Sequence, residues 1–334
     1  MDIDELVALS VKHNASDLHL CPGQMPIVRI DGGLRCLESL PVVQEACVTG
    51  CRDRCLDMRG RELLALSGQA DCALELGAGQ RVRGHFFRQR TGLSATFRLI
   101  AGQVPTLAAL GVPAAIPGLL AQSQGLLLVT GATGSGKSSS LAAMVDYINH
   151  QRQVHIVTLE DPTEFIHHPQ RCLIQQREIG EHCPDFATGL RAAMRADPDI
   201  ILLGELRDSE SIRLALGAAE TGHLVLATLH ARHAAQGVDR LLDAFAAGEQ
   251  AFARGLLAGS LLAIMAQKLV SREQGGRMGL FELLIATPAV RNVIRDGKTH
   301  LLPGLLQTGK GQGMQSFAMG ERQDGHNGQP GVRK

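Results

Sequence analysis

The stretch GLLLVTGATGSGKSSS at residues 125–140 decides the fold of this chain. An apolar run leads into a glycine-rich loop, and Leu141, Met144, Val145 and Ile148 then recur at the spacing of an amphipathic helix. Strand, GxxxxGK[ST] loop and helix in this order make a Walker A motif, which binds phosphate through backbone amides and a helix N-terminus. The motif predicts a nucleotide site formed by Gly131, Ala132, Thr133, Gly134, Ser135, Gly136, Lys137, Ser138 and Ser139.

The residue types in this loop suit the binding of a nucleoside triphosphate. Small residues let backbone amides approach the phosphates, Lys137 supplies positive charge to the β and γ oxygens, and Ser138 offers a hydroxyl to magnesium. A glycine-rich turn that arose by chance is the alternative, but it would require neither the strand before it nor the helix after it. The sequence therefore predicts ATP and Mg²⁺ as cofactors.

Three more apolar runs follow the loop, at residues 154–159, 200–203 and 224–227. Continuous runs of this kind, separated by helical patterns, are typical of strands buried on both faces, and they predict a mainly parallel α/β sheet. Each run ends in polar or glycine-rich residues. Because ligands of open parallel sheets bind at the carboxyl ends of the strands, we expect these stretches and the glycine-rich loop to meet at one cleft.

Acidic residues at the strand ends are candidates for orienting and deprotonating a water molecule in line with the γ-phosphate. Glu205 follows the run 200–203 and stands where a Walker B acid would; a solvated acid at a strand end is the alternative. Glu160, Asp161 and Glu164 form a second acidic group. We expect one of these three to help hold Mg²⁺ or its water molecules.

Two histidines flank the run 224–227. A lone histidine is usually structural, and for His223 the structural and functional interpretations both stay open. His230, at the carboxyl end of the run, is placed to hydrogen-bond a phosphate or a catalytic carboxylate. A metal-binding pair is not expected.

The chain before the loop reads as a separate domain. Residues 1–102 contain a helical pattern at 2–12 and strand-like runs at 16–20, 27–37 and 93–100, which indicate a small α+β domain with an antiparallel sheet. The run 27–37 contains Asp-Gly, a hairpin turn signal. This domain also holds a concentrated basic segment, with Arg81, Arg83, Arg88, Arg90 and Arg98.

The remaining boundaries follow from glycine and proline. Residues 103–118 are rich in both and predict a linker, after which 119–308 form the nucleotide-binding domain with C-terminal helices. Within it, apolar residues at helical spacing predict a helix that runs through 255–267. Glycine recurs from 309 onward, so we expect a flexible tail at 309–334.

Composition argues against several classes of protein. Lys and Arg number 33, as do Asp and Glu, and the chain has no Trp and one Tyr, so neither a basic field nor a stacking surface predicts nucleic-acid binding. The longest uncharged apolar stretch is shorter than the roughly 18 residues that a spanning helix needs. The N-terminus is acidic, unlike a secretory signal. We expect a cytoplasmic protein.

The eight cysteines are expected to be reduced thiols. Three of them, Cys47, Cys51 and Cys55, fall on one face of a predicted helix and could suggest a metal site. No CxxC pair accompanies them, so a buried helix face is favoured over a zinc site.

Several segments, taken in order, carry a resemblance to a known family. They are SDLHL at 16–20, the Walker A loop, TLEDP at 158–162, GELRD at 204–208, and TGH with TLH within 221–230. Together they resemble the secretion ATPase superfamily, and most closely the retraction ATPases of type IV pili. The resemblance extends from about residue 2 to about residue 315.

This resemblance implies an architecture and a partner set. The expected fold is a PAS-like N-terminal domain followed by a RecA-like P-loop domain. The expected assembly is a homohexamer that hydrolyses ATP to depolymerise pilin through an inner-membrane platform protein. Such a protein would be peripheral to the cytoplasmic face of that membrane and would bind no nucleic acid.

The resemblance also implies residue roles. Glu205 matches the catalytic glutamate of the Walker B segment, and His223 and His230 match a histidine box. Arg83 and Arg98 match N-domain arginines that reach the phosphates. The aspartate box of the family is matched by Glu160, Asp161 and Glu164.

Residues 289–295 look like the retraction motif of the family. Two other segments match the family poorly: Ala231-Arg232-His233 replaces the small hydroxyl residues usual after His230, and the tail from Phe317 diverges. Three hypotheses therefore stay open: a pilus retraction or secretion motor, a diverged paralogue without a role in twitching, and a RecA-like nucleic-acid translocase.

Overall fold

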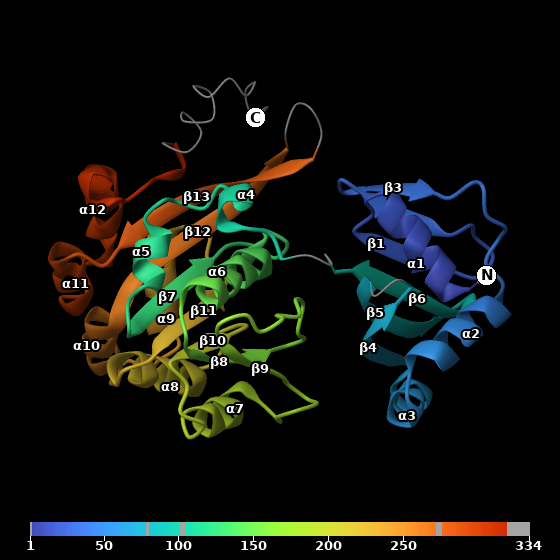
Figure 1. Ribbon diagram of the computed structural model, residues 1–334, viewed down its shortest axis with the longest axis horizontal. Helices are drawn as coiled ribbons and strands as arrows, with labels where there is room; N and C mark the ends of the chain where they lie inside the picture. Colours follow the sequence, from blue (N-terminus) through green and yellow to red (C-terminus); the bar gives the residue numbers. More distant parts are fainter. Residues whose placement is uncertain (1, 78–79, 101–103, 272–275, 319–334) are drawn as a thin grey trace. The chain divides into compact units, whose positions relative to one another are not determined.

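The computed structural model describes residues 2–77, 80–100, 104–271 and 276–318 (Figure 1). The chain divides into two compact units, Met1–Gln103 and Val104–Lys334. No helix within the described ranges is long and apolar enough to cross a bilayer.

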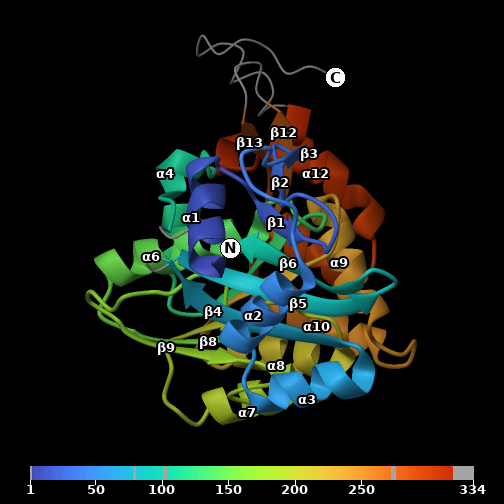
Figure 2. The same ribbon diagram turned by 90° about the vertical axis from the view of Figure 1, so that its right-hand side faces the viewer.

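The N-terminal unit is a six-stranded antiparallel sheet with three helices (Figure 2). Its strands run in the order β3-β2-β1-β6-β5-β4. They are β1 (Asp17–Leu20), β2 (Ile27–Ile30), β3 (Gly33–Cys36), β4 (Gln69–Leu76), β5 (Gln80–Gln89) and β6 (Gly92–Leu99). The helices α1 (Ile3–Lys12), α2 (Glu45–Cys55) and α3 (Met58–Ser67) contribute to one apolar cluster with the sheet.

Local sequence explains the first elements of this unit. Asp2 caps α1 by accepting a hydrogen bond from the amide of Asp4. Asp31 and Gly32 have positive φ angles of 49° and 86°, as a two-residue hairpin turn requires, and they join β2 to β3. The helix predicted at 2–12 and the hairpin within 27–37 are confirmed.

The C-terminal unit contains the mainly parallel sheet that the apolar runs predicted. Seven strands lie in the order β13-β12-β7-β11-β10-β8-β9, and only the β12–β13 pair is antiparallel. They are β7 (Gly125–Thr130), β8 (His155–Glu160), β9 (Leu173–Glu178), β10 (Ile200–Leu203), β11 (Leu224–Leu229), β12 (Leu261–Ser271) and β13 (Arg277–Ile285).

Helices cover both faces of this sheet (Figure 1). Leu127 and Val129 of β7 pack with one helical layer, whereas Leu126 and Leu128 pack with the other. The first layer comprises α4 (Leu107–Leu110), α5 (Ile116–Leu120) and α6 (Lys137–Gln151). The second comprises α7 (Phe186–Ala193), α8 (Ser209–Glu220), α9 (Ala234–Asp243), α10 (Gln250–Ser260), α11 (Pro288–Arg295) and α12 (Leu302–Thr308).

The helix predicted through 255–267 is wrong beyond Ser260. Helix α10 ends there, Leu261 takes an extended conformation with φ −61° and ψ 129°, and β12 begins. Because β12 is buried from Ala263 to Gln267 on both faces of the sheet, its apolar residues do not alternate with polar ones. A continuous apolar run of this kind cannot be distinguished from a buried helix by periodicity.

The segments expected to be a linker and a flexible tail also contain packed residues. Within 103–118, Leu107 and Ile116 belong to the core beside α6. Beyond Gly309, Met314 and Phe317 are 3% and 8% exposed, and Gln315 pairs with Leu283 of β13. Packing therefore continues at least to Phe317; residues 319–334 lie outside the described residues.

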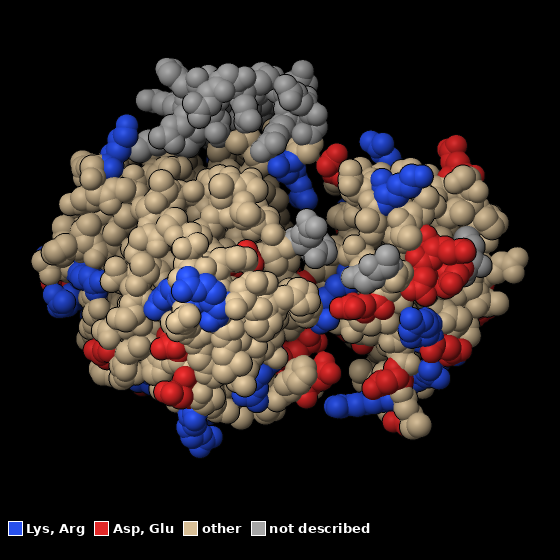
Figure 3. All heavy atoms as spheres, viewed as in Figure 1, with Lys and Arg blue, Asp and Glu red and all other residues tan. Residues whose placement is uncertain are grey.

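Charged side chains of both signs are mixed on the face drawn in Figure 3. No continuous stripe of Lys and Arg is visible on that face. This mixture agrees with the equal counts of basic and acidic residues, 33 each.

Candidate functional site

The Walker A loop joins the end of β7 to the start of α6. Lys137, the first residue of α6, folds back over the loop, and its Nζ donates hydrogen bonds to the carbonyls of Gly131 (3.1 Å) and Ala132 (3.0 Å). Burial lowers the pKa of Lys137, and the negative charges of Glu205 and Glu164 partly offset this effect. The ammonium group therefore lies half-buried, within electrostatic reach of two carboxylates.

The N-terminus of α6 fits a phosphate group. The N-cap residue Gly136 has a φ of 91° and provides no side-chain cap, whereas Asp185 and Asp208 cap α7 and α8 by accepting hydrogen bonds from backbone amides. The first-turn amides of α6 thus have no capping side chain, and the helix dipole favours an anion there. Ser138, half-buried in the same turn, provides a hydroxyl for Mg²⁺.

Glu205 is placed by contacts among three parallel strands. The amide of Gly204 donates to the carbonyl of Leu159 at the end of β8, and Thr228 of β11 donates its hydroxyl to the Gly204 carbonyl. A Cβ atom at position 204 would lie 3.3 Å from Glu160 Cα, so a side chain there would crowd β8. Because Gly204 has no side chain, the chain can pass close to β8, and Glu205 lies two residues beyond the end of β10 at the carboxyl edge of the sheet.

Two basic side chains hold the Glu205 carboxylate. His230 Nε2 lies 3.1 Å from Oε1, and Arg207 Nη2 donates to Oε2 at 2.7 Å. The hydrogen bond and the charge of Glu205 raise the pKa of Arg207. His230 was predicted to hydrogen-bond a phosphate or a catalytic carboxylate, and the structure places it beside the carboxylate of Glu205. Arg207 was missed, although it stands in the GELRD segment two residues after Glu205.

The three acids of the second group differ in their surroundings. Glu160 is tied into the sheet, because its Oε1 accepts hydrogen bonds from Thr158 (2.7 Å) and Gln176 (3.1 Å). Burial raises the pKa of Glu160, an effect that these bonds oppose. Asp161 and Glu164 are exposed, and their charges reach Arg207 and Lys137 respectively. Asp161 and Glu164 are thus the better placed to act on a bound ion or water.

His223 lies at the opposite end of β11 from His230. Its Nδ1 bonds to the carbonyl of Ala218 at 3.0 Å, and its backbone joins the end of α8 to the start of β11. Seven steps along the chain separate the two histidines, about 23 Å at about 3.3 Å per residue. This geometry favours the structural interpretation of His223.

The segment after His230 is anchored to β13. The amide of Ala234 donates to Glu282 Oε1 at 2.7 Å, and His233 Nδ1 lies 3.4 Å from the other oxygen. The His233 ring also lies 5.6 Å from that of Phe317. Glu282 therefore caps α9, and Arg232 is left exposed.

Arg83 and Arg98 are direct cross-strand partners on β5 and β6 of the N-terminal unit. Val82 and Phe97 beside them are buried in the core, so the two arginines lie on the other face of the sheet. Arg98 Nε lies 3.0 Å from Asp17 Oδ1 on β1. Like charges directly opposite each other are destabilising, and Asp17 offsets part of that repulsion.

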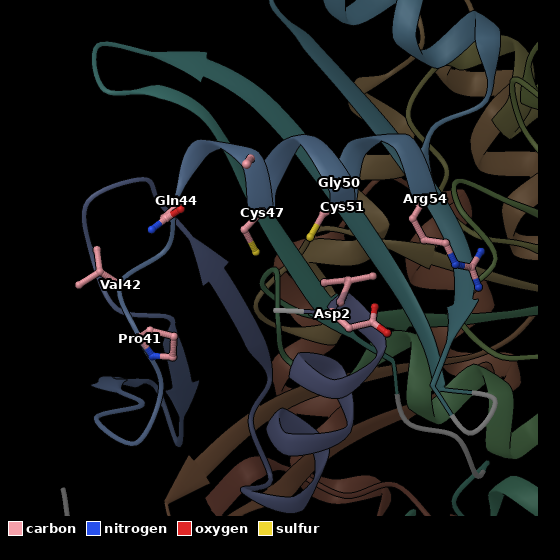
Figure 4. A pocket seen from close by; sticks show the side chains of 10 residues that line it. Asp2, Pro41, Val42, Gln44, Cys47, Gly50, Cys51 and Arg54 are labelled. Atoms are coloured by element: carbon pink, nitrogen blue, oxygen red, sulfur yellow. The ribbon is translucent and has the colours of Figure 1, made fainter.

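The thiols of α2 lie on a packed helix face. Figure 4 shows Cys47 and Cys51 pointing from α2 into a surface pocket of about 540 Å³ that Asp2 and Arg54 also line. Burial, with a further contribution from Cys47, raises the pKa of Cys51 to about 12. Among the residues described, no group of three or more His, Cys, Asp or Glu is arranged to hold a metal ion.

Comparison with known proteins places this geometry in a family. A family profile described as "Type II/IV secretion system protein" matches residues 112–319, more than half of the 334-residue chain. The chain belongs to this family. It is 44% identical over 319 residues to the type IV pilus retraction ATPase PilT of Pseudomonas aeruginosa, covering 96% of this chain and 92% of that protein.

Two further likenesses extend over nearly the whole of this secretion-family chain. The uncharacterized protein YggR of Escherichia coli is 56% identical over 318 residues, covering 95% of this chain and 96% of YggR. A crystal structure of the pilus retraction motor PilT with bound ADP superimposes with a TM-score of 0.90 at 36% identity, covering 100% of this chain and 95% of that one. The expected α/β fold of a RecA-like secretion ATPase is confirmed.

Proposed function

We propose that this protein is an ATPase that powers the retraction of a type IV pilus or a related secretion machine. The proposal rests on one observation above all: a Walker A lysine and the strand-end acid Glu205 share one edge of the parallel sheet, close enough for the charge of Glu205 to act on Lys137. The full-length likeness to PilT of Pseudomonas aeruginosa supports the motor function.

The proposed roles follow from the chemistry of each group. Lys137 and the first-turn amides of α6 bind the phosphates of ATP, while Glu205 orients the attacking water and takes its proton. His230 holds the Glu205 carboxylate in place. Ser138, with Asp161 acting through water, would hold Mg²⁺, which when bound supplies positive charge to the phosphate oxygens.

Arg83 and Arg98 are proposed to supply further charge to the phosphates during hydrolysis. A pair of arginines in direct register costs free energy unless an anion compensates it, and Asp17 compensates part of this cost through its contact with Arg98 Nε. Binding a phosphate would provide that compensation.

Replacement of Arg98 tests this role. We expect Arg98→Ala to lower the kcat of ATP hydrolysis about a thousandfold with a small change in nucleotide affinity, because an arginine that meets developing phosphate charge acts mainly in the transition state. The matched control is Arg29→Ala, since Arg29 also lies 3.8 Å from Asp17. If Arg98→Ala and Arg29→Ala had equal kcat values, Arg83 and Arg98 would contribute to the stability of the fold alone.

The assembly and partners are proposed from the family. We propose a homohexamer that acts on an inner-membrane platform protein from the cytoplasmic face of that membrane. Because rings of RecA-like domains complete their sites between subunits, the oligomer is expected to form with nucleotide.

Two measurements test the proposed function. In ATP and Mg²⁺ we expect a species about six times the 35.6 kDa chain, with ATP turnover. Expression in a Pseudomonas aeruginosa strain that lacks PilT should then restore twitching. A monomer without turnover would refute the motor, whereas an active hexamer that does not restore twitching would identify a diverged paralogue. The departure at Ala231-Arg232-His233 is the feature that favours this second candidate.

A further inference from the structure

We infer that Gln267 is a positioning residue that holds the Walker A loop in its phosphate-binding shape. The inference rests on the proposed ATPase function and concerns the same site. Gln267 lies on β12, which pairs in parallel with β7, and its neighbour Ala266 is in register with Thr130 at the end of β7. Gln267 therefore stands beside the first residue of the loop.

Burial of this amide requires a specific partner. Gln267 is 3% exposed, and the preceding residues Ala263 to Ala266 are fully buried and apolar. A buried primary amide costs free energy unless it is hydrogen-bonded, so an apolar side chain would suit the core better. Here Nε2 donates to the carbonyl of Ser135 at 2.7 Å, inside the Walker A loop.

The loop also packs against Gln267 at both of its ends. A Cβ atom at Gly131 would lie 2.5 Å from the backbone oxygen of Gln267, and one at Gly136 would lie 3.1 Å from Nε2. Residue 131 must therefore be glycine because β12 lies so close, and not only because phosphate must approach the backbone. Gln267 thus contacts the loop at its start, at Ser135 and at its end.

The hydrogen bond from Gln267 to the Ser135 carbonyl controls the direction of the next backbone amide, the N–H of Gly136. In a trans peptide the carbonyl of one residue and the N–H of the next point in opposite directions. When Gln267 holds the Ser135 carbonyl toward β12, the N–H of Gly136 must point away from β12. This amide immediately precedes Lys137 and belongs to the group that binds phosphate at the start of α6.

The expected consequence is a change in nucleotide affinity rather than in the chemical step. The loop contacts phosphates in ATP, in the transition state and in ADP alike, so a disordered Ser135 peptide weakens all three by a similar factor. Such uniform loss raises KM and leaves kcat nearly unchanged. A residue that served only the stability of the fold would not separate KM from kcat in this way.

Gln267→Met tests the inference, because methionine keeps the length of the side chain and removes the donor. We expect the Kd of the full-length protein for ADP and the KM for ATP to rise about 5- to 30-fold, with kcat within about twofold of the parent protein. The matched control is Gln315→Met. Gln315 also donates its Nε2 to a backbone carbonyl, that of Phe281 at 3.1 Å, outside the Walker A loop.

Three outcomes would overturn the inference: unchanged affinity in Gln267→Met, equal losses in both variants, or a fall in kcat at constant KM. If Gln267→Met does not fold, Gln267→Leu serves instead, since it also removes the donor and places an apolar side chain among the apolar residues of β12; it must weaken ADP binding at least as much. A parent protein that binds no nucleotide would refute the proposed function itself, and so that failure is distinguishable from failure of the inference.

Discussion

Glu205→Gln is expected to abolish steady-state ATP hydrolysis while ATP still binds. The amide keeps the shape of the side chain and can still contact His230 and Arg207, but it cannot take a proton from water. Loss of a general base lowers the rate by about 10²- to 10⁴-fold. The variant should therefore accumulate bound ATP, which single-turnover hydrolysis and nucleotide-binding measurements would detect together.

The control for this variant is another glutamate whose carboxylate is also hydrogen-bonded by an arginine. Glu249 accepts a hydrogen bond from Arg213 at 2.7 Å, the distance of the Arg207–Glu205 bond, but it lies between α9 and α10 and follows no strand of the sheet. Glu249→Gln should hydrolyse ATP at the parental rate. If Glu205→Gln also did so, the base would have to be sought at Glu164, whose charge reaches Lys137.

Lys137→Ala is expected to weaken nucleotide binding by about 100-fold or more, because it removes charge-assisted hydrogen bonds to two phosphates. In the unliganded protein, by contrast, we expect Lys137→Ala to leave the folded state as stable as in the parent or more stable. Burial lowers the pKa of Lys137, so at pH 7 the folded state bears the cost of a partly desolvated ammonium group. This cost is fully present below the folded pKa and is lost as the pH rises toward the unfolded value.

Thermal unfolding with and without ADP separates these two effects. The unliganded Lys137→Ala protein should have a Tm equal to or above that of the parent, and an ADP concentration that saturates the parent should raise the Tm of the variant much less. Lys298→Ala, which removes an exposed lysine paired with Asp296, is the control and should keep the full ADP-induced shift. An unliganded Lys137→Ala protein that is clearly less stable than the parent would show that the lysine mainly braces the loop through Gly131 and Ala132.

Together these variants assign the steps of the reaction to separate residues. Lys137 and Gln267 should govern how tightly nucleotide binds, whereas Glu205 and Arg98 should govern how fast it is hydrolysed. The measurements can be made on the same full-length protein, so differences among the four need no assumption about isolated domains.

Much of the nucleotide site could be predicted from the sequence because its parts are local. The Walker A spacing, the strand before it and the helix after it lie within residues 125–151. Glu205 was found because it directly follows a continuous apolar run, and such runs end at the ligand-binding edge of a parallel sheet. The hairpin at Asp31-Gly32 was found for the same reason, since two adjacent residues determine the turn.

Periodicity failed where burial removed the pattern. In β12 both faces are covered by helices, so the residues from Ala263 to Ala266 are all apolar, and nothing in their order distinguishes a strand from a helix. The error hid Gln267, because a glutamine at the end of a predicted helix carries no functional meaning. Its partner Ser135 lies 132 residues earlier in the chain.

The sequence by itself determined the phosphate-binding loop, the four strands β7, β8, β10 and β11 and the candidate base Glu205, since each depends on residues that are neighbours along the chain. Only the tertiary structure showed that Gln267 contacts Ser135 of the loop, that His230 lies beside Glu205, and that Arg83 stands opposite Arg98 in the N-terminal sheet. These contacts depend on strand order and register, which follow from how the whole sheet buries its apolar faces rather than from any local run of residues.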